Sequence, residues 1–289
     1  MKKIDLIYIG PLGYSGSTIL DRILGEHPNL LNLGEVMFYD EWKYNDFLCG
    51  CGAKFTKCEF WNEVNNHLPM NFRLEGKVRS KKFNLLYLKP RNFYNKSIQM
   101  GKNSYDLFSN LIKITGDNSS KIVDSSKVPG RLSMLASSGF FNIYVIHLIR
   151  NGKQVCGSMK VRKKMPSRDK EDFTKPMPVW KSAIRWYFSN KTFIKVCKEY
   201  SLPVITIKYE DLVDKYDAIK HDLFSFLQLE SNDYAHHANR HTISGSHWKW
   251  IDEGRFQSDI PKEKYTLNKF EKICFNLIAG RMYKKYGYK

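Results

Sequence analysis

The chain has 289 residues, of which 42% are hydrophobic and 14% aromatic, so it can bury a sizeable core and global disorder is excluded. Lysine and arginine outnumber aspartate and glutamate by 47 to 29, and the net charge of +18 favours anionic ligands, polyanions or acidic surfaces. No apolar run reaches the roughly 18 residues that a membrane span needs. The first residues are expected to form a strand rather than a secretion signal, because Asp5 interrupts their apolar stretch.

Short β-rich runs alternate along the chain with stretches of helical spacing. Strands are expected at residues 4–10, 121–124, 142–149 and 204–208, with a further short strand just before Glu35. Helices are expected at 18–24, 152–164, 179–200, 212–227 and 267–285. The alternation predicts an α/β fold in which helices flank both faces of a central parallel sheet, as a single domain over residues 1–289. Ligands of such sheets bind at the carboxyl ends of the strands.

Residues 39–119 interrupt this alternation, because they are basic, aromatic and mostly helical in pattern. We interpret them as an insertion that covers the site. From Arg73 to Lys102 the only acid is Glu75, and aromatic residues are interleaved with the basic ones. That pattern suits single-stranded nucleic acid, but it is more often an amphipathic helix whose lysine stems cover apolar surface. No nucleic-acid partner is therefore expected, whereas peripheral contact with an anionic surface stays open.

Six cysteines in a chain of this length are too few for a disulfide scaffold, which favours a reducing, cytoplasmic setting. Cys49, Cys51 and Cys58 lie in one short segment, and His67 follows nine residues after the last of them. These four side chains could bind zinc, but the C-x-C opening differs from the usual C-x₂₋₄-C of zinc sites. We rank a loop of the lid first, a disulfide second and zinc third, so no metal is expected.

A glycine-rich loop, G-P-L-G-Y-S-G-S-T at residues 10–18, follows the first expected strand and leads directly into a helix. Glycine permits positive φ values, and the start of a helix presents free backbone N–H groups, so the loop predicts a phosphate cradle rather than an ordinary turn. The expected phosphate-binding residues are Gly13, Tyr14, Ser15, Gly16, Ser17 and Thr18. The loop is not a Walker A motif, because Ser17 stands where that motif requires lysine.

A second phosphate site is predicted at the end of the expected strand 142–149. Arg150 leaves this strand, and Ser158 follows eight residues later in the next helix. A guanidinium group offers a bidentate fork to phosphate, and a serine hydroxyl adds a neutral donor. Arg150 alone would more often be a surface ion-pair residue, but together with the glycine-rich loop a role in ligand binding is favoured.

These two motifs resemble those of the sulfotransferases that use 3′-phosphoadenosine 5′-phosphosulfate (PAPS), whose fold is a P-loop-like three-layer sandwich. Their 5′-phosphosulfate loop is similar to S-G-S-T-I-L at residues 15–20 followed by His27-Pro28, although Tyr14 stands where relatives usually carry arginine or lysine. Arg150 and Ser158 resemble their 3′-phosphate site. The resemblance covers residues 4 to about 35 and 121 to about 249, and the insertion is not matched.

The same resemblance implies roles for further residues. V-D-S-S-K-V-P at residues 123–129 is similar to a segment of the tyrosylprotein branch, which implies that Lys127 stabilises the leaving 5′-phosphate and that Glu35, after the H-P pair, is the catalytic base. Y-E-D-L at 209–212 implies that Tyr209 lies near the adenine, unless it is an ordinary core aromatic. H-T-I-S-G-S-H-W-K-W at 241–250 resembles a cofactor loop in which Gly245 and Lys249 match.

The implied activity is transfer of the sulfuryl group of PAPS to an acceptor hydroxyl by in-line displacement, with no metal required. Cytosolic relatives use a histidine base, so His27, His67 and His147 are rivals to Glu35; we expect His147 to be structural and His67 to face the acceptor. The insertion is then the acceptor lid. The expected acceptor is a small hydroxylated molecule such as a sterol, phenol or lipid-like alcohol, with a saccharide as the alternative. Rival functions are a P-loop kinase-like nucleotide-binding enzyme and a non-catalytic polyanion-binding protein.

Overall fold

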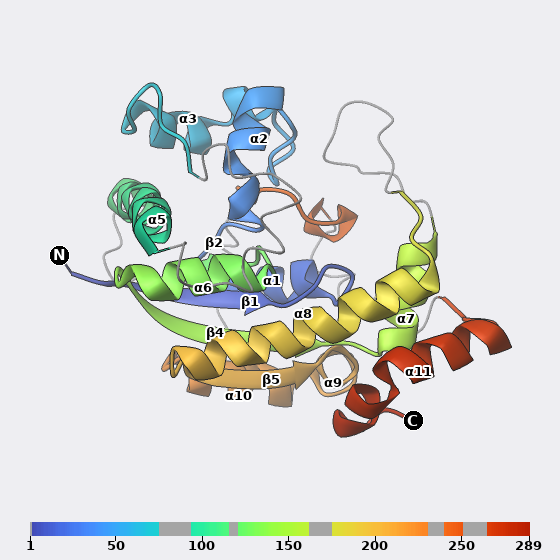
Figure 1. Ribbon diagram of the computed structural model, residues 1–289. Helices are drawn as coiled ribbons and strands as arrows, with labels where there is room; N and C mark the ends of the chain where they lie inside the picture. Colours follow the sequence, from blue (N-terminus) through green and yellow to red (C-terminus); the bar gives the residue numbers. More distant parts are fainter. Residues whose placement is uncertain (1, 75–93, 116–120, 162–174, 231–239, 251–264) are drawn as a thin grey trace.

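The computed structural model describes residues 2–74, 94–115, 121–161, 175–230, 240–250 and 265–289 (Figure 1). Its centre is a five-stranded sheet in the order β2-β3-β1-β4-β5, and neighbouring strands are parallel. The strands are β1 (Ile4–Gly10), β2 (Leu30–Asn32), β3 (Lys121–Asp124), β4 (Phe141–Ile149) and β5 (Val204–Lys208). The expected parallel sheet is therefore confirmed, including the short strand before Glu35.

Helices cover both faces of the sheet, because β1 is buried on both sides and its residues alternate between two cores. Leu6 and Tyr8 pack in one core with α5 (Tyr94–Thr115), α6 (Pro129–Ser138) and α8 (Val179–Glu199). Ile7 and Ile9 pack in the other core with α1 (Ser17–Gly25), α9 (Tyr209–Asp214) and α10 (Tyr216–Phe226). Figure 1 shows α6 and α8 along one face of the sheet and α10 beyond β5. The result is a three-layer α/β sandwich.

The helix boundaries differ from the predicted ones at several places. The expected helix 212–227 is two helices, α9 and α10, since Lys215 between them has φ −133° and ψ 45°, outside the helical region. The helix after Arg150, α7 (Gly152–Lys160), ends before residue 164, and positions 162–164 lie outside the described residues. The last helix, α11 (Lys269–Lys285), begins at an Asn268 capping box. Helix α6 was not predicted.

The described part of residues 39–119 is mostly helical. It contains α2 (Tyr39–Asn45), the short 3₁₀ turn Phe55–Lys57, α3 (Glu59–Asn66) and α5, and a further 3₁₀ turn, Val36–Phe38, immediately precedes it. Residues 75–93 and 116–119, which include most of the basic stretch, lie outside the described residues. Tyr39, Trp42 and Trp61 belong to the same buried cluster as Leu6 and Tyr8, so this segment shares the core of the sheet. Among the described helices, none combines the length and the apolar character needed to cross a bilayer.

Candidate functional site

The glycine-rich loop joins the central strand β1 to the start of α1. Gly16 is the N-cap of α1 and has φ +92°, and a Cβ at this position would overlap the ring of Tyr209. Glycine is therefore required there for two reasons, the backbone conformation and the close approach of the tyrosine. The Ser15 hydroxyl donates a hydrogen bond to the Leu12 carbonyl at 2.6 Å, which closes the loop. The Ile19 and Leu20 N–H groups donate to the Gly16 carbonyl, whereas those of Ser17 and Thr18 precede the first helical hydrogen bond, the position at which backbone N–H groups bind anions.

Arg150 lies next to this loop. Its Nη1 donates a hydrogen bond to the Tyr14 carbonyl at 3.2 Å, and its Cζ lies 4.2 Å from the centroid of the Tyr209 ring. Tyr209 is 1% exposed, and burial raises its pKa. The Tyr209 ring thus lies against both Gly16 and Arg150. The structure brings Arg150 and the glycine-rich loop together around a single aromatic ring.

The turn after Arg150 is held by polar contacts. The Asn151 N–H donates to the Glu210 Oε1 at 2.9 Å, and the Asn151 side chain accepts hydrogen bonds from the backbone of Lys153 and Gln154 at the start of α7. Ser158 is buried further along the same helix. Glu210 of the Y-E-D-L segment therefore positions this turn, a role that the sequence did not suggest.

Glu35 and Lys127 form an ion pair. They follow β2 and β3, which are neighbouring parallel strands, so their side chains emerge at the same edge of the sheet. The distance between Lys127 Nζ and Glu35 Oε1 is 2.7 Å, with the lysine side chain 9% and the glutamate side chain 17% exposed. The Ser244 hydroxyl donates a hydrogen bond to the same Glu35 oxygen at 3.3 Å. The predicted base and the predicted leaving-group cation thus lie in direct contact.

The segment at residues 240–250 lies across the start of α1. Its Ser246 N–H donates a hydrogen bond to Thr18 Oγ1 at 3.2 Å, and Gly245, with φ +89°, approaches the Thr18 side chain. The segment is tied to the end of β2, because Ile243 exchanges backbone hydrogen bonds of 2.8 and 2.9 Å with Glu35 and Leu33. In Figure 1 this orange segment runs between α2 and α1.

A pocket opens where this segment meets α1 and the ends of β2 and β3. Its lining includes Thr18, Asp21, Gly34, Ser125, Gly245 and Lys249. Lys249 is 7% exposed, and its Nζ donates a hydrogen bond to the Leu48 carbonyl at 3.4 Å. Burial lowers the pKa of Lys249 to about 8. The predicted cofactor residues Gly245 and Lys249 therefore lie on the side of the site that contains Thr18 and Glu35.

Asp21 and Asp124 are buried carboxylates that sequence reasoning missed. Asp21 accepts a hydrogen bond of 3.0 Å from the Asn32 side chain, and burial raises the pKa of Asp21 to about 6. Asp124 pairs with Arg131 at 2.7 Å and accepts the Ser126 N–H at 2.9 Å, so it shapes the turn that carries Lys127. Asp21 lies between Leu20 and Arg22 and Asp124 between Val123 and Ser125, and nothing in these local patterns distinguishes the two from exposed acids.

The three histidines that were rivals to Glu35 contact other groups in the described part of the chain. His67 is exposed at the end of α3, where its Nε2 lies 3.0 Å from Glu63. His147 is buried in β4 between Asn190 and Thr206, and burial lowers its pKa to about 4, as befits the structural role expected for it. His27 contacts the Glu230 carbonyl at 3.2 Å. His241 is instead the histidine that gathers with Cys49, Cys51 and Cys58 beside the pocket.

No family model matches the chain, and no curated protein matches it in sequence. Solved structures with a similar fold include sulfotransferases. The sulfotransferase domain from the curacin biosynthetic pathway is 18% identical with a TM-score of 0.56, over 100% of this chain and 99% of that one. The corresponding domain of the Synechococcus PCC 7002 olefin synthase is 16% identical with a TM-score of 0.53, over 100% and 97%.

The sulfotransferase STF9 from Mycobacterium avium is 8% identical with a TM-score of 0.52, over 100% of this chain and 78% of that one. At these identities the similarity establishes architecture. The chain has the sulfotransferase fold, an α/β sandwich with a parallel sheet and flanking helices, and the resemblance noted in the sequence is confirmed at that level.

Proposed function

We propose that the protein is a sulfotransferase that transfers the sulfuryl group of PAPS to a hydroxyl group of a small acceptor. One observation carries the proposal: Arg150 donates a hydrogen bond to the Tyr14 carbonyl of the glycine-rich loop and lies on the Tyr209 ring that packs against Gly16. Two phosphate sites so close together suit one nucleotide that carries phosphates at its 5′ and 3′ positions. The sulfotransferase fold supports the same assignment.

The residues present fit this ligand, because their donors are neutral or cationic, as two phosphates require. The backbone amides of residues 13–18 and the Thr18 hydroxyl would hold the 5′ end, and Arg150 with Ser158 would hold the 3′-phosphate. Tyr209 would lie near the adenine. PAPS supplies an activated sulfuryl group, and its departing part is adenosine 3′,5′-bisphosphate.

The chain supplies proton transfer and charge stabilisation. Glu35 accepts the proton of the acceptor hydroxyl, and the Ser244 hydroxyl orients its carboxylate. Lys127, 2.7 Å from Glu35, provides positive charge for the departing phosphate. Lys249, a buried residue in the lining of the pocket, supplies the cation that is missing at Tyr14, where the family usually carries arginine or lysine. Sulfuryl transfer then depends on positioning and electrostatics, as phosphoryl transfer does.

A ligand panel distinguishes this function from its rivals. Adenosine 3′,5′-bisphosphate without added metal is expected to raise the melting temperature, whereas Mg-ATP and heparin are not. Stabilisation by Mg-ATP alone would indicate a kinase-like enzyme, and stabilisation by heparin alone would indicate a polyanion-binding protein. Transfer is then measured with sulfur-labelled PAPS and a mixed panel of phenols, sterols, lipid-like alcohols and saccharides.

The base is tested by Glu35→Gln, which keeps the size of the side chain and removes its ability to take a proton. We expect transfer to fall by about 10²- to 10⁴-fold while the bisphosphate still binds. Glu63→Gln, at an exposed glutamate that pairs with His67, is the matched control and should leave transfer unchanged. Full transfer by Glu35→Gln together with its loss in His67→Asn would make the histidine the base instead.

A further inference from the structure

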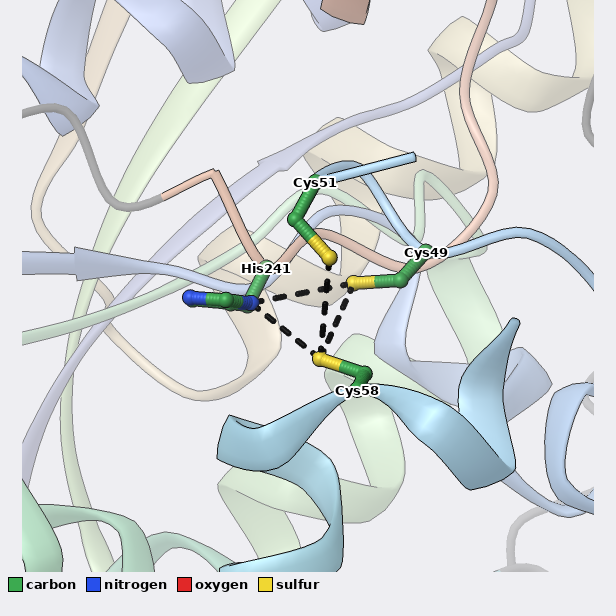
Figure 2. A group of neighbouring side chains, drawn as sticks. All are labelled: Cys49, Cys51, Cys58 and His241. Carbon is green, nitrogen blue, oxygen red and sulfur yellow. Dashed lines mark hydrogen bonds between the residues drawn. The ribbon is translucent and has the colours of Figure 1, made fainter. Parts of the chain in front are cut away.

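Four potential metal ligands converge beside the pocket, from two segments that lie far apart in the sequence. Figure 2 shows the side chains of Cys49, Cys51, Cys58 and His241 pointing toward one another. Their three Sγ atoms and one ring nitrogen all lie within 4.8 Å of one another. Cys58 Sγ is 3.7 Å from both of the other sulfurs, while His241 Nδ1 is 3.2 Å from Cys58 Sγ and 4.0 Å from Cys49 Sγ.

These distances match the edges of a tetrahedron around zinc. With Zn–S bonds of about 2.3 Å, tetrahedral ligation separates two sulfurs by about 3.8 Å. With a Zn–N bond of about 2.0–2.1 Å, it separates sulfur from nitrogen by about 3.6 Å. The two sulfur–sulfur separations of 3.7 Å agree with the first value, and the sulfur–nitrogen separations of 3.2 and 4.0 Å lie on either side of the second.

We propose that Cys49, Cys51, Cys58 and His241 bind one zinc ion in a closed Cys₃His site. Three sulfurs with one imidazole form a ligand set that zinc prefers, and four protein ligands leave no open position, as in structural rather than catalytic sites. This inference revises the sequence-based ranking, in which zinc came third and His67 was its fourth ligand.

A disulfide explains the cluster less well. All six cysteines are free thiols in the structure, and a bond of about 2.05 Å between any two sulfurs would leave the third thiol and the imidazole without a role. The His241 ring is held by stacking on Phe60 at 4.7 Å, which orients Nδ1 toward the sulfurs.

Hydrogen bonds of the surrounding backbone also hold the ligand residues in place. The Cys49 N–H donates to the Ala53 carbonyl at 2.8 Å and the Gly52 N–H donates to the Cys49 carbonyl at 3.0 Å, which makes a tight turn that places Cys49 and Cys51 on the same side. Gly52 has φ +90°, a conformation that favours glycine. The Trp61 indole N–H donates to the His241 carbonyl at 3.0 Å, so the two segments are joined directly beside the ligands.

The ion would fix the segment that completes the site. His241 begins the segment 240–250, whose Ser244 contacts Glu35 and whose Ser246 contacts Thr18. Cys49, Cys51 and Cys58 belong to the insertion, and Cys51 lines the pocket. The metal thus clamps the insertion onto the segment over the phosphate loop. This consequence for nucleotide binding rests on the proposed function, whereas the presence of the metal does not.

Metal content is the direct test. The full-length chain, produced in zinc-supplemented medium and purified by gel filtration without chelators, is expected to carry about one zinc per chain by mass spectrometry. Cys58→Ser and His241→Ala should reduce this to near zero, while Cys274→Ser, at a cysteine outside the cluster, and His67→Ala should retain it. Retention by His241→Ala with loss in His67→Ala would overturn the ligand assignment.

A second measurement does not depend on the stability of the variants. Cobalt added to the metal-stripped wild-type chain should give the intense thiolate charge-transfer band and the visible bands of a tetrahedral site, and one equivalent of zinc should abolish them. A wild-type chain that carries no zinc and gives no cobalt bands would overturn the proposal. Neither measurement uses the sulfuryl donor or an acceptor, so failure here is distinguishable from failure of the proposed function.

Discussion

Arg150 provides the sharpest test of how the nucleotide is bound, because its effect should depend on one chemical group of the ligand. The side chain has two kinds of contact: structural ones to Tyr14 and Tyr209, and the proposed one to the 3′-phosphate. Arg150→Ala removes both. Adenosine 5′-monophosphate lacks the 3′-phosphate, so only the structural contacts should affect its binding.

The magnitude follows from the type of contact. A hydrogen bond to a charged group contributes about 1.5–3 kcal/mol. At about 1.4 kcal/mol for each factor of ten, this corresponds to about 10- to 150-fold in Kd. Arg150→Ala should therefore reduce the preference for adenosine 3′,5′-bisphosphate over the 5′-monophosphate by about that factor. The nucleotide preference of Arg150→Lys should lie between those of the wild type and Arg150→Ala, since lysine keeps the charge and loses the bidentate fork.

Isothermal titration of both nucleotides against both proteins gives a complete double-mutant cycle. Arg185→Ala, at an exposed arginine of α8, is the matched control and should leave all affinities unchanged. If Arg150→Ala weakened both nucleotides by the same factor, Arg150 would only shape the loop, and the assignment of the 3′-phosphate site would be refuted. Urea unfolding of each variant shows that the chains compared are folded.

Two further predictions concern the loop and the core. Gly16→Ala places a Cβ against Tyr209 and also forces an unfavourable φ of +92°, so it should abolish bisphosphate binding. It should also lower the free energy of unfolding by more than Gly139→Ala does, because Gly139, with φ +77°, carries only the backbone penalty of about 1–2 kcal/mol. Equal losses of stability in urea unfolding would contradict this prediction. Burial lowers the pKa of His147 from 6.5 to about 4, so between these two pH values only the unfolded chain protonates this histidine. Lowering the pH across that range should therefore reduce the free energy of unfolding by about 3 kcal/mol. The difference between wild type and His147→Gln across that pH range, measured by urea unfolding, isolates this contribution, and parallel curves would show that His147 is not responsible.

The contact between Glu35 and Lys127 shows what a comparison of motifs can predict and what it cannot. Each residue was identified separately from its motif, without any indication that the two side chains meet. Their 2.7 Å ion pair arises because β2 and β3 are adjacent parallel strands, and strand order is not written in either motif. Asp21 illustrates the opposite case: its sequence surroundings are ordinary, and only the packing of α1 against β2 buries its carboxylate.

The sequence by itself determined the alternation of strands and helices, the glycine-rich loop between β1 and α1, and the position of Ser158 on the helix that follows Arg150. These features depend on consecutive residues whose backbone preferences and spacing act locally. Only the tertiary structure decided that His241, not His67, meets Cys49, Cys51 and Cys58, because that choice depends on how a segment more than 180 residues away in sequence folds back over the insertion. Local spacing places side chains on an element, whereas the order of strands and the packing of loops determine which side chains meet.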